Sequence, residues 1–200
     1  MEDLLATDFR TGKPTNFGTV FKVAAQFLHD NQVPHVFVGT LALNTYIRPR
    51  YTQEIQIICD HLAIGQVDSE LNRIAEQAGF GGSIKVEAPT NPAMTHALAS
   101  TTPVGLFDTT AHVPTALALC WFFLETDDLS SQVDAGSLLA AGMLASYELQ
   151  SLLERHASNP ALIRFGEAKR NVEQGRYSGT YSDSVRARLQ RRQQKDADAN

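Results

Sequence analysis

Hydrophobic residues near the start of the chain follow the spacing of one helical face. They recur at intervals of three and four residues, at Phe17, Val20, Phe21, Ala24, Phe27 and Leu28. Asn16 can cap this helix, which we expect to end near Asp30 and Asn31. A short apolar run at 36–38 then predicts a strand that stops at Gly39-Thr40, and residues 41–46 predict a second, short helix.

The next segment changes to the period of a strand. Residues 52–60 alternate polar and apolar side chains before becoming continuously apolar, which predicts a strand buried on one face and then on both. Glu54, Gln56 and Ile58 therefore share one side of this strand. We then expect a helix at 66–79, a strand at 84–88, a long loop at 89–102, one strand at 104–113 and a helix at 115–125 opened by Pro114.

The remainder of the chain has helical periodicity. The helical pattern begins at Asp134, a broad apolar surface extends from Leu138 to Leu153, and Asn159-Pro160 starts another helix through Lys169. We expect a homodimer or a protein partner to cover part of this surface. The whole pattern predicts an α/β fold, with a core and small mixed sheet at 14–114, a helical part at 115–174, and a linker and tail at 175–200.

Composition narrows the class of protein. The 200 residues are 43% hydrophobic and 20% charged, as in a globular domain, and the net charge of -5 excludes a basic surface for nucleic acid over the whole chain. Cys59 and Cys120 each lie in an apolar run and are predicted to be buried thiols. The longest apolar run, at 116–124, is too short to cross a bilayer, and the acidic N-terminus is unlike a signal peptide. We therefore expect a cytoplasmic protein without a membrane partner.

A local basic cluster lies in the tail. A predicted helix capped by Ser182 or Asp183 carries five basic residues: Arg186, Arg188, Arg191, Arg192 and Lys195. Such a cluster indicates a nucleic acid or another anionic partner. The alternative is a solvated terminal helix, which the neighbouring aspartates and the lack of aromatic residues after Tyr181 favour.

The Gly39-Thr40 turn is a candidate phosphate site. A glycine-led turn that enters a helix leaves backbone N–H groups unpaired, and these groups attract phosphate together with the helix dipole. Gly39 permits close approach of a triphosphate, and Thr40 supplies a hydroxyl. The pair is a weak signal by itself, but Arg50-Tyr51-Thr52-Gln53-Glu54-Ile55-Gln56 follows shortly after it.

This combination resembles the nucleotidyltransferase superfamily, in particular its minimal and abortive-infection-toxin members. In that superfamily a Gly-Gly or Gly-Ser turn precedes Arg-x-Thr-x-Asp-Ile-Asp, and the two aspartates share two magnesium ions that bridge the nucleotide phosphates. The resemblance covers 17–58 well, continues in element order to Gly79 and is looser beyond. It implies that Gly39, Thr40, Arg50 and Thr52 bind a nucleoside triphosphate and that positions 54 and 56 hold magnesium.

The residues at the two metal positions differ from that pattern. Glu54 keeps the charge on a longer side chain, while Gln56 keeps only a neutral carbonyl oxygen. A third carboxylate normally comes from a later strand, where Asp108 is the first candidate and Glu87 the second, so Glu54 and Asp108 are the expected metal ligands. The alternative for Asp108 is that it caps a turn at Thr109-Thr110. Losing one metal from such a site slows transfer by about a thousandfold or more.

These departures favour a catalytically impaired protein that acts through binding or regulation, in an antitoxin-like manner. Its catalytic positions would be Glu54, Gln56 and Asp108. One alternative is an active enzyme that uses magnesium and a nucleoside triphosphate to modify RNA or protein. Another is a structural or interaction protein that binds no nucleotide and needs no cofactor.

Overall fold

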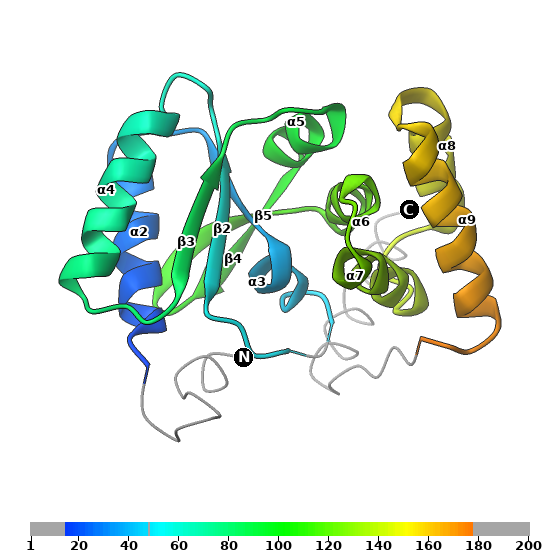
Figure 1. The fold of residues 1–200 in the computed structure, drawn as a ribbon, viewed down its shortest axis with the longest axis horizontal. Coiled ribbons are helices and arrows are strands. Elements are labelled where there is room, and N and C mark those ends of the chain that lie inside the picture. The colour runs from blue at the N-terminus through cyan, green and yellow to red at the C-terminus, as the bar shows by residue number, and fades with distance from the viewer. Residues whose placement is uncertain (1–14, 48, 178–200) are drawn as a thin grey trace, which may run out of the picture.

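A small mixed sheet forms the centre of the protein. The computed structural model describes residues 15–47 and 49–177 (Figure 1). Strand β1 (His35–Val38) pairs antiparallel with β2 (Glu54–Cys59), and β2 pairs parallel with β3 (Ser83–Glu87). Helix α4 (Ile64–Gln77) makes the crossover that a parallel β2–β3 pair requires. The predicted fold class, α/β with a small mixed sheet followed by helices, is confirmed.

The period of two in β2 separates an apolar face from a partly polar one. Ile55, Ile57 and Cys59 are buried in one cluster with helices α2 (Phe17–Asp30) and α4, which cover one side of the sheet in Figure 1. The other face carries Glu54, Gln56 and Ile58. Only its Ile58 end is closed, by a small apolar cluster beneath helix α5 (Pro92–Ala99). The end of this face that carries Glu54 and Gln56 is not covered by this apolar cluster.

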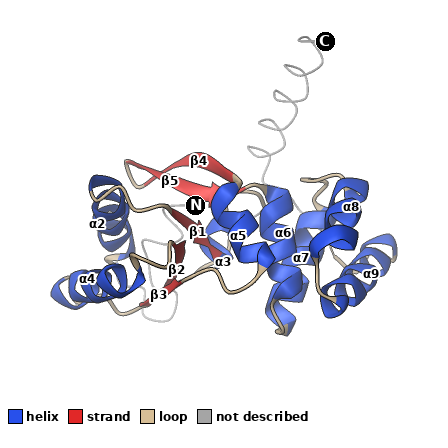
Figure 2. Cartoon of the chain, turned by 90° about the horizontal axis from the view of Figure 1, so that it is seen from above, coloured by secondary structure: helices blue, strands red, loops and turns tan. Residues whose placement is uncertain are grey.

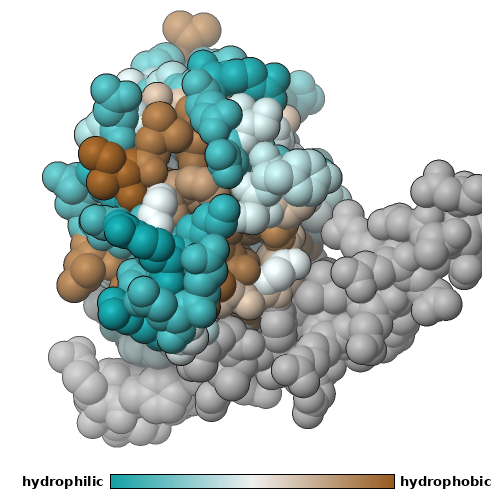
Figure 3. All heavy atoms as spheres, turned by 90° about the vertical axis from the view of Figure 1, so that its right-hand side faces the viewer, coloured by the Kyte–Doolittle hydropathy of each residue, from teal (hydrophilic) through white to brown (hydrophobic). Residues whose placement is uncertain are grey.

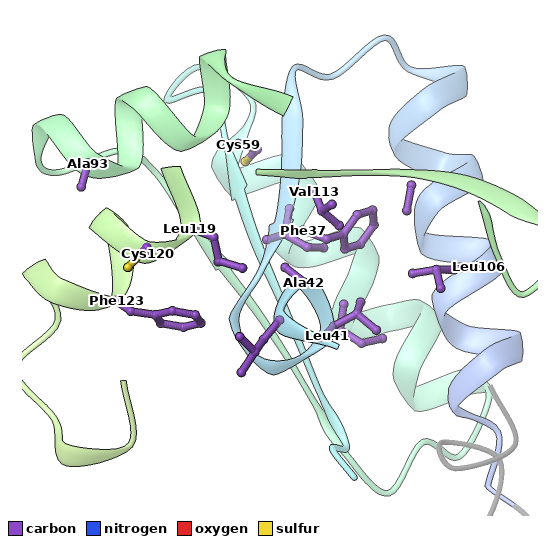
Figure 4. Packing of buried hydrophobic residues seen from close by; sticks show 14 of the residues in the cluster. Phe37, Leu41, Ala42, Cys59, Ala93, Leu106, Val113, Leu119, Cys120 and Phe123 are labelled. Atoms are coloured by element: carbon purple, nitrogen blue, oxygen red, sulfur yellow. The ribbon is translucent and has the colours of Figure 1, made fainter. Parts of the chain in front are cut away.

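Four helices in the described part of the chain follow the sheet and share its core. They are α6 (Ala116–Glu125), α7 (Leu129–Ala140), α8 (Ser146–His156) and α9 (Asn159–Glu173). Helix α6 is apolar on nearly all sides and is buried accordingly, because it packs against α5, α7 and α9 as well as β5. Figure 4 shows Leu119 of α6 beside Phe37 of β1, and both belong to one buried cluster with Phe123 and with Leu41 of the short helix α3 (Gly39–Leu43). One hydrophobic core therefore joins the sheet to the helical part.

The expected long loop at 89–102 is wrong, because it contains helix α5. Asn91 caps this helix by accepting a hydrogen bond from the backbone N–H of Met94 at 2.9 Å, and Pro92 occupies the first turn. Both features are standard helix-start signals. The Thr-rich and Ala-rich composition of the segment concealed them.

The expected single strand at 104–113 is also wrong. The segment forms a hairpin of β4 (Thr101–Leu106) and β5 (Thr109–Pro114), which Figure 2 shows beside β1. Phe107 and Asp108 make the turn with φ of 49° and 56°, the left-handed conformation that a tight hairpin requires. Pro114 ends β5, and the Thr115 side chain, which accepts a hydrogen bond from the Ala118 N–H, caps α6 instead.

The helical region expected from Asp134 begins earlier and is divided. Asp128 caps α7, whose first residue is Leu129, and a turn with Gly142 at φ 63° separates α7 from α8. Leu138, Leu149 and Leu153 of the expected apolar surface are fully buried in the protein's own core. The face formed by α8 and α9 is mixed in Figure 3, where hydrophilic side chains surround smaller hydrophobic patches, and Tyr147 and Ile163 are exposed on these helices. A homodimer or protein partner on the helical part stays a prediction.

Two further expectations concern location. The basic tail with Arg186, Arg188, Arg191, Arg192 and Lys195 lies outside the described residues. Among the helices that the structure describes, none combines the length and the apolar character needed to cross a membrane.

Cys59 and Cys120 are buried as predicted, and burial raises the pKa of both thiols, that of Cys59 to about 11.

The turn from β1 into α3 depends on Gly39. Its φ is +67°, and a methyl group on its Cα would overlap Oε1 of Gln56 across the β1–β2 pair. We expect Gly39→Ala to lower the free energy of unfolding by about 1–3 kcal/mol, measured in urea, because both the backbone and the Gln56 amide would be strained. Gly65→Ala is the matched control, since it lies in α4 with no atom within 4 Å of an added Cβ. Its expected change is a gain of up to about 1 kcal/mol, and equal changes in the two variants would contradict this role of Gly39.

Candidate ligand site at the polar end of the sheet

A cavity of about 810 Å³ lies between the polar end of the sheet and the helical part. The sheet and the start of α3 supply one wall, and the end of α6 with the start of α7 supplies the opposite wall. Its polar lining comprises Gly39, Thr40, Glu54, Gln56, His61, Lys85, Glu87, Thr90, Asn91, Glu125, Thr126, Asp128, Ser130, Ser131 and Asp134. The volume lies within the range of small-molecule sites.

The sheet wall brings Gln56 and Lys85 together. Their Cα atoms are register partners in the parallel β2–β3 pair, so both side chains leave the same face of the sheet. Lys85 Nζ lies 3.1 Å from Oε1 of Glu87, two residues further along β3. Glu54 is exposed at the edge of the cavity, and its carboxylate makes no hydrogen bond or ion pair within residues 15–47 and 49–177.

The carboxylates of α6 and the loop after it already have partners in the protein. Glu125 accepts hydrogen bonds from Trp121 Nε1 at 3.0 Å and from the backbone and hydroxyl of Ser158 at 3.0 and 2.6 Å. Burial would raise the pKa of Glu125, but these hydrogen bonds and Arg164 hold it below its ordinary value. Asp128 accepts hydrogen bonds from the Ser130 and Ser131 hydroxyls, which lower the pKa of its carboxyl.

Asp134 on α7 is buried and pairs with Arg50. Arg50 Nη2 donates to Oδ1 of Asp134 at 2.5 Å, and the backbone of Arg50 is held by Asn44 through two hydrogen bonds at 2.7 and 2.9 Å. Burial raises the pKa of Asp134, while the Arg50 guanidinium opposes this rise. The pair fastens the segment before β2 to the helical part.

The predicted nucleotide-binding residues divide into two groups. Gly39 and Thr40 line the cavity, whereas Arg50 and Thr52 are not among its lining residues. Arg50 is engaged with Asp134, and Thr52 Oγ1 accepts a hydrogen bond from the Glu54 backbone N–H at 3.1 Å. The Gln56 amide lies against Gly39, in the space where this glycine was expected to admit a phosphate.

The expected third carboxylate at Asp108 is not brought to Glu54. Asp108 stands in the turn of the β4–β5 hairpin with a side chain 94% exposed, 3.9 Å from Lys22 Nζ, and it borders a different hollow. Glu87, the second candidate, does line the cavity with Glu54 and Gln56. The hairpin turn is the physical reason for this correction, and it agrees with the alternative that places Asp108 at a turn.

This donor set does not fit a pair of magnesium ions. Two-metal sites need several carboxylates that clamp cations about 4 Å apart. Here position 56 offers a neutral amide, Glu87 is paired with the Lys85 ammonium, and the Lys85 Cα is the register partner of the Gln56 Cα. Within the part of the chain that the structure describes, no group of three or more His, Cys, Asp or Glu side chains has a geometry that could hold a metal ion.

Lys85 and the carboxylates after α6 are the cavity residues that sequence interpretation missed. Lys85 lies in a strand that was predicted, but nothing in its own pattern shows which residue of β2 it accompanies. Glu125, Asp128 and Asp134 come to the cavity only because α6 packs against β5 and folds back into α7. A helix-start signal at Asp128 was the one available sequence clue, since aspartate is a preferred cap.

Comparisons with known proteins give likeness of backbone only. No protein-family model matches the sequence, and no curated protein matches it either. The solution structure of the antibiotic-resistance factor ANT(2'')-Ia aligns at 10% identity and a TM-score of 0.41, over 91% of this chain and 95% of that chain. A nucleotidyltransferase-like protein from Paracoccidioides brasiliensis aligns at 15% identity and a TM-score of 0.48, over 76% of this chain and 93% of that chain.

The Arg50–Asp134 pair generates a prediction about stability. Arg50→Met leaves a buried carboxylate without its partner, so we expect the free energy of unfolding near pH 7 to fall by about 1–3 kcal/mol. The loss should shrink as pH falls from 7 through the raised pKa of Asp134, because the carboxyl then takes up a proton and needs no counter-charge. Urea unfolding across this pH range measures both effects.

The double variant Arg50→Met/Asp134→Asn is the matched control for this pair. It removes the carboxylate together with its partner, so it should lose less stability than Arg50→Met and show a weaker dependence on pH. A constant deficit at all pH values, equal in the two variants, would contradict an electrostatic role for Arg50.

Proposed function

We propose that this protein has a nucleotidyltransferase-like fold, does not transfer nucleotides, and uses the cavity at the polar end of its sheet to bind a nucleotide. In this proposal it acts through the bound state, as a regulatory or binding protein. An antitoxin-like role is one form of this activity and stays a prediction. The order β1, glycine turn, α3 and β2 supports the proposed fold, because it matches the order in the sequence resemblance.

The observation that carries the proposal is the chemistry of β2 and β3. The two positions that hold aspartates in active members carry Glu54 and Gln56, and Lys85 lies beside Gln56. An amide contributes no charge to a metal, and a neighbouring ammonium repels one. Each metal in a two-metal site contributes several kcal/mol to the transition state, so a site that holds neither metal loses transfer by many orders of magnitude.

Binding requires less of the site than transfer does. The cavity is large enough for a nucleotide, and the Thr40 hydroxyl and the side-chain N–H groups of Asn91 offer hydrogen-bond donors along its walls. Phe122 and Met94 add apolar surface at the same cavity. These groups do not depend on the two metal positions, which supports retention of binding after loss of transfer.

The experiment is a transfer assay paired with a binding assay. We expect each labelled nucleoside triphosphate, incubated with magnesium or manganese and with RNA or protein acceptors, to leave no label on any acceptor. Isothermal titration should nevertheless detect binding of at least one nucleotide. Glu54→Ala should change neither the absence of label nor the fold, as judged by circular dichroism.

Label transfer by the wild-type protein that disappears in Glu54→Ala would overturn the proposal and show an active enzyme. Failure of every nucleotide to bind would also contradict it, and would favour the structural or interaction role. Thr109→Ala serves as a control for nonspecific effects, since Thr109 lies on the hairpin outside the cavity.

A further inference from the structure

We infer that Lys85 supplies the positive charge that divalent metal ions supply in two-metal sites, so that the cavity binds phosphate groups without a divalent cation. This inference rests on the proposed function and names the chemistry by which the ligand is held. It follows from the placement of Lys85 and from the charges around it.

Lys85 is the middle residue of β3, the strand at one edge of the sheet wall. Its Cα is the register partner of Gln56, and Gln56 in turn is the register partner of Val38, the residue before Gly39. The Lys85 side chain therefore emerges on the face where a metal would lie between positions 54 and 56. It lines the cavity together with Gly39 and Thr40.

The Lys85 ammonium is available to a ligand. Its partner in the protein is Glu87, at 3.1 Å, and the two side chains are 53% and 37% exposed. Exposed ion pairs of this kind contribute little to stability, typically below about 1 kcal/mol. A phosphate group can therefore replace Glu87 as the partner of Lys85 at small cost, with a charge-assisted hydrogen bond of the same kind.

The remaining charges of the cavity distinguish this site from a metal site. Asp134 is paired with Arg50, and Glu125 and Asp128 are held by hydrogen bonds within the protein. Glu54, and Glu87 once phosphate has taken its place beside Lys85, face the ligand as unpaired carboxylates. In a metal site Glu54 would hold the cation and thereby favour phosphate binding, whereas beside a lysine it repels phosphate. Removing the charge of Glu54 should thus weaken phosphate binding in a metal site and strengthen it in a site that uses Lys85.

The test measures ATP binding by isothermal titration in EDTA, with the full chain. We expect wild-type protein to bind ATP in EDTA within about threefold of its affinity in magnesium. Lys85→Met should weaken binding at least tenfold, Lys85→Arg should retain it, and Glu54→Gln should strengthen it severalfold. Lys22→Met is the matched control, because Lys22 lies on α2 near Asp108 and outside the cavity.

Inorganic tripolyphosphate separates recognition of phosphate from recognition of the nucleoside. If Lys85 acts on the phosphates, tripolyphosphate should show the same loss in Lys85→Met as ATP does. Binding of tripolyphosphate that is indifferent to Lys85 would overturn the inference. Circular dichroism of each variant confirms that a loss of affinity reflects the site and not unfolding.

Two other results would overturn the inference while leaving the proposed function intact. One is ATP binding that disappears in EDTA, and the other is loss of ATP binding in Glu54→Gln, since both would show a metal-dependent site. Absence of ATP binding in every buffer would overturn the inference and the nucleotide-binding part of the proposed function together. The transfer assay described above fails or succeeds independently of these outcomes.

Discussion

The pairing of β2 between β1 and β3 is the constraint on which the rest of the structure depends. Because strand side chains alternate, one register places Ile55, Ile57 and Cys59 in the core and Glu54 and Gln56 at the cavity. A shift by one residue would bury Glu54 and Gln56 and expose three core residues. The same register brings Gln56 against Gly39 on one side and beside Lys85 on the other. Core and site are thus specified by a single set of backbone hydrogen bonds.

The cavity combines the two parts of the chain. Its sheet wall is fixed by the register of β2, and its helical wall is fixed by the Arg50–Asp134 pair and by the hydrogen bonds from Ser158 and Trp121 to Glu125. These interactions use carboxylates that would otherwise be free to hold cations. The protein therefore stabilises its helical part with the same side chains that make the cavity poor in available metal ligands.

The local spacing of hydrophobic and polar residues was sufficient to predict the first half of the fold. The helical spacing of 17–28 and the alternation at 52–60 each reflect burial on one face, and burial is what the sequence records most directly. The structure places Gly39, which follows β1, against the Gln56 side chain at the polar end of β2. The helix at 92–99 was missed although Asn91 and Pro92 are common start signals, since its composition lacks a strong apolar period.

The candidate site was predicted less completely, for a physical reason. A two-residue turn at Phe107 and Asp108 reverses the chain. Asp108 therefore lies at the tip of a hairpin and not in the strand that was expected there. The partnership of Lys85 with Gln56 depends on the parallel crossover through α4, which joins residues that are distant in sequence. Arg50 and Asp134 are likewise joined only by tertiary packing.

The central claim is that Gln56 and Lys85 together exclude divalent metal from this site. Manganese binding, followed by electron paramagnetic resonance, tests it in the wild type, in Gln56→Asp and in Gln56→Asp/Lys85→Ser. The account predicts no site-bound manganese in the wild type, little in Gln56→Asp because the ammonium remains, and clear binding in the double variant. Manganese bound by the wild-type protein and released by Glu54→Gln would contradict the account.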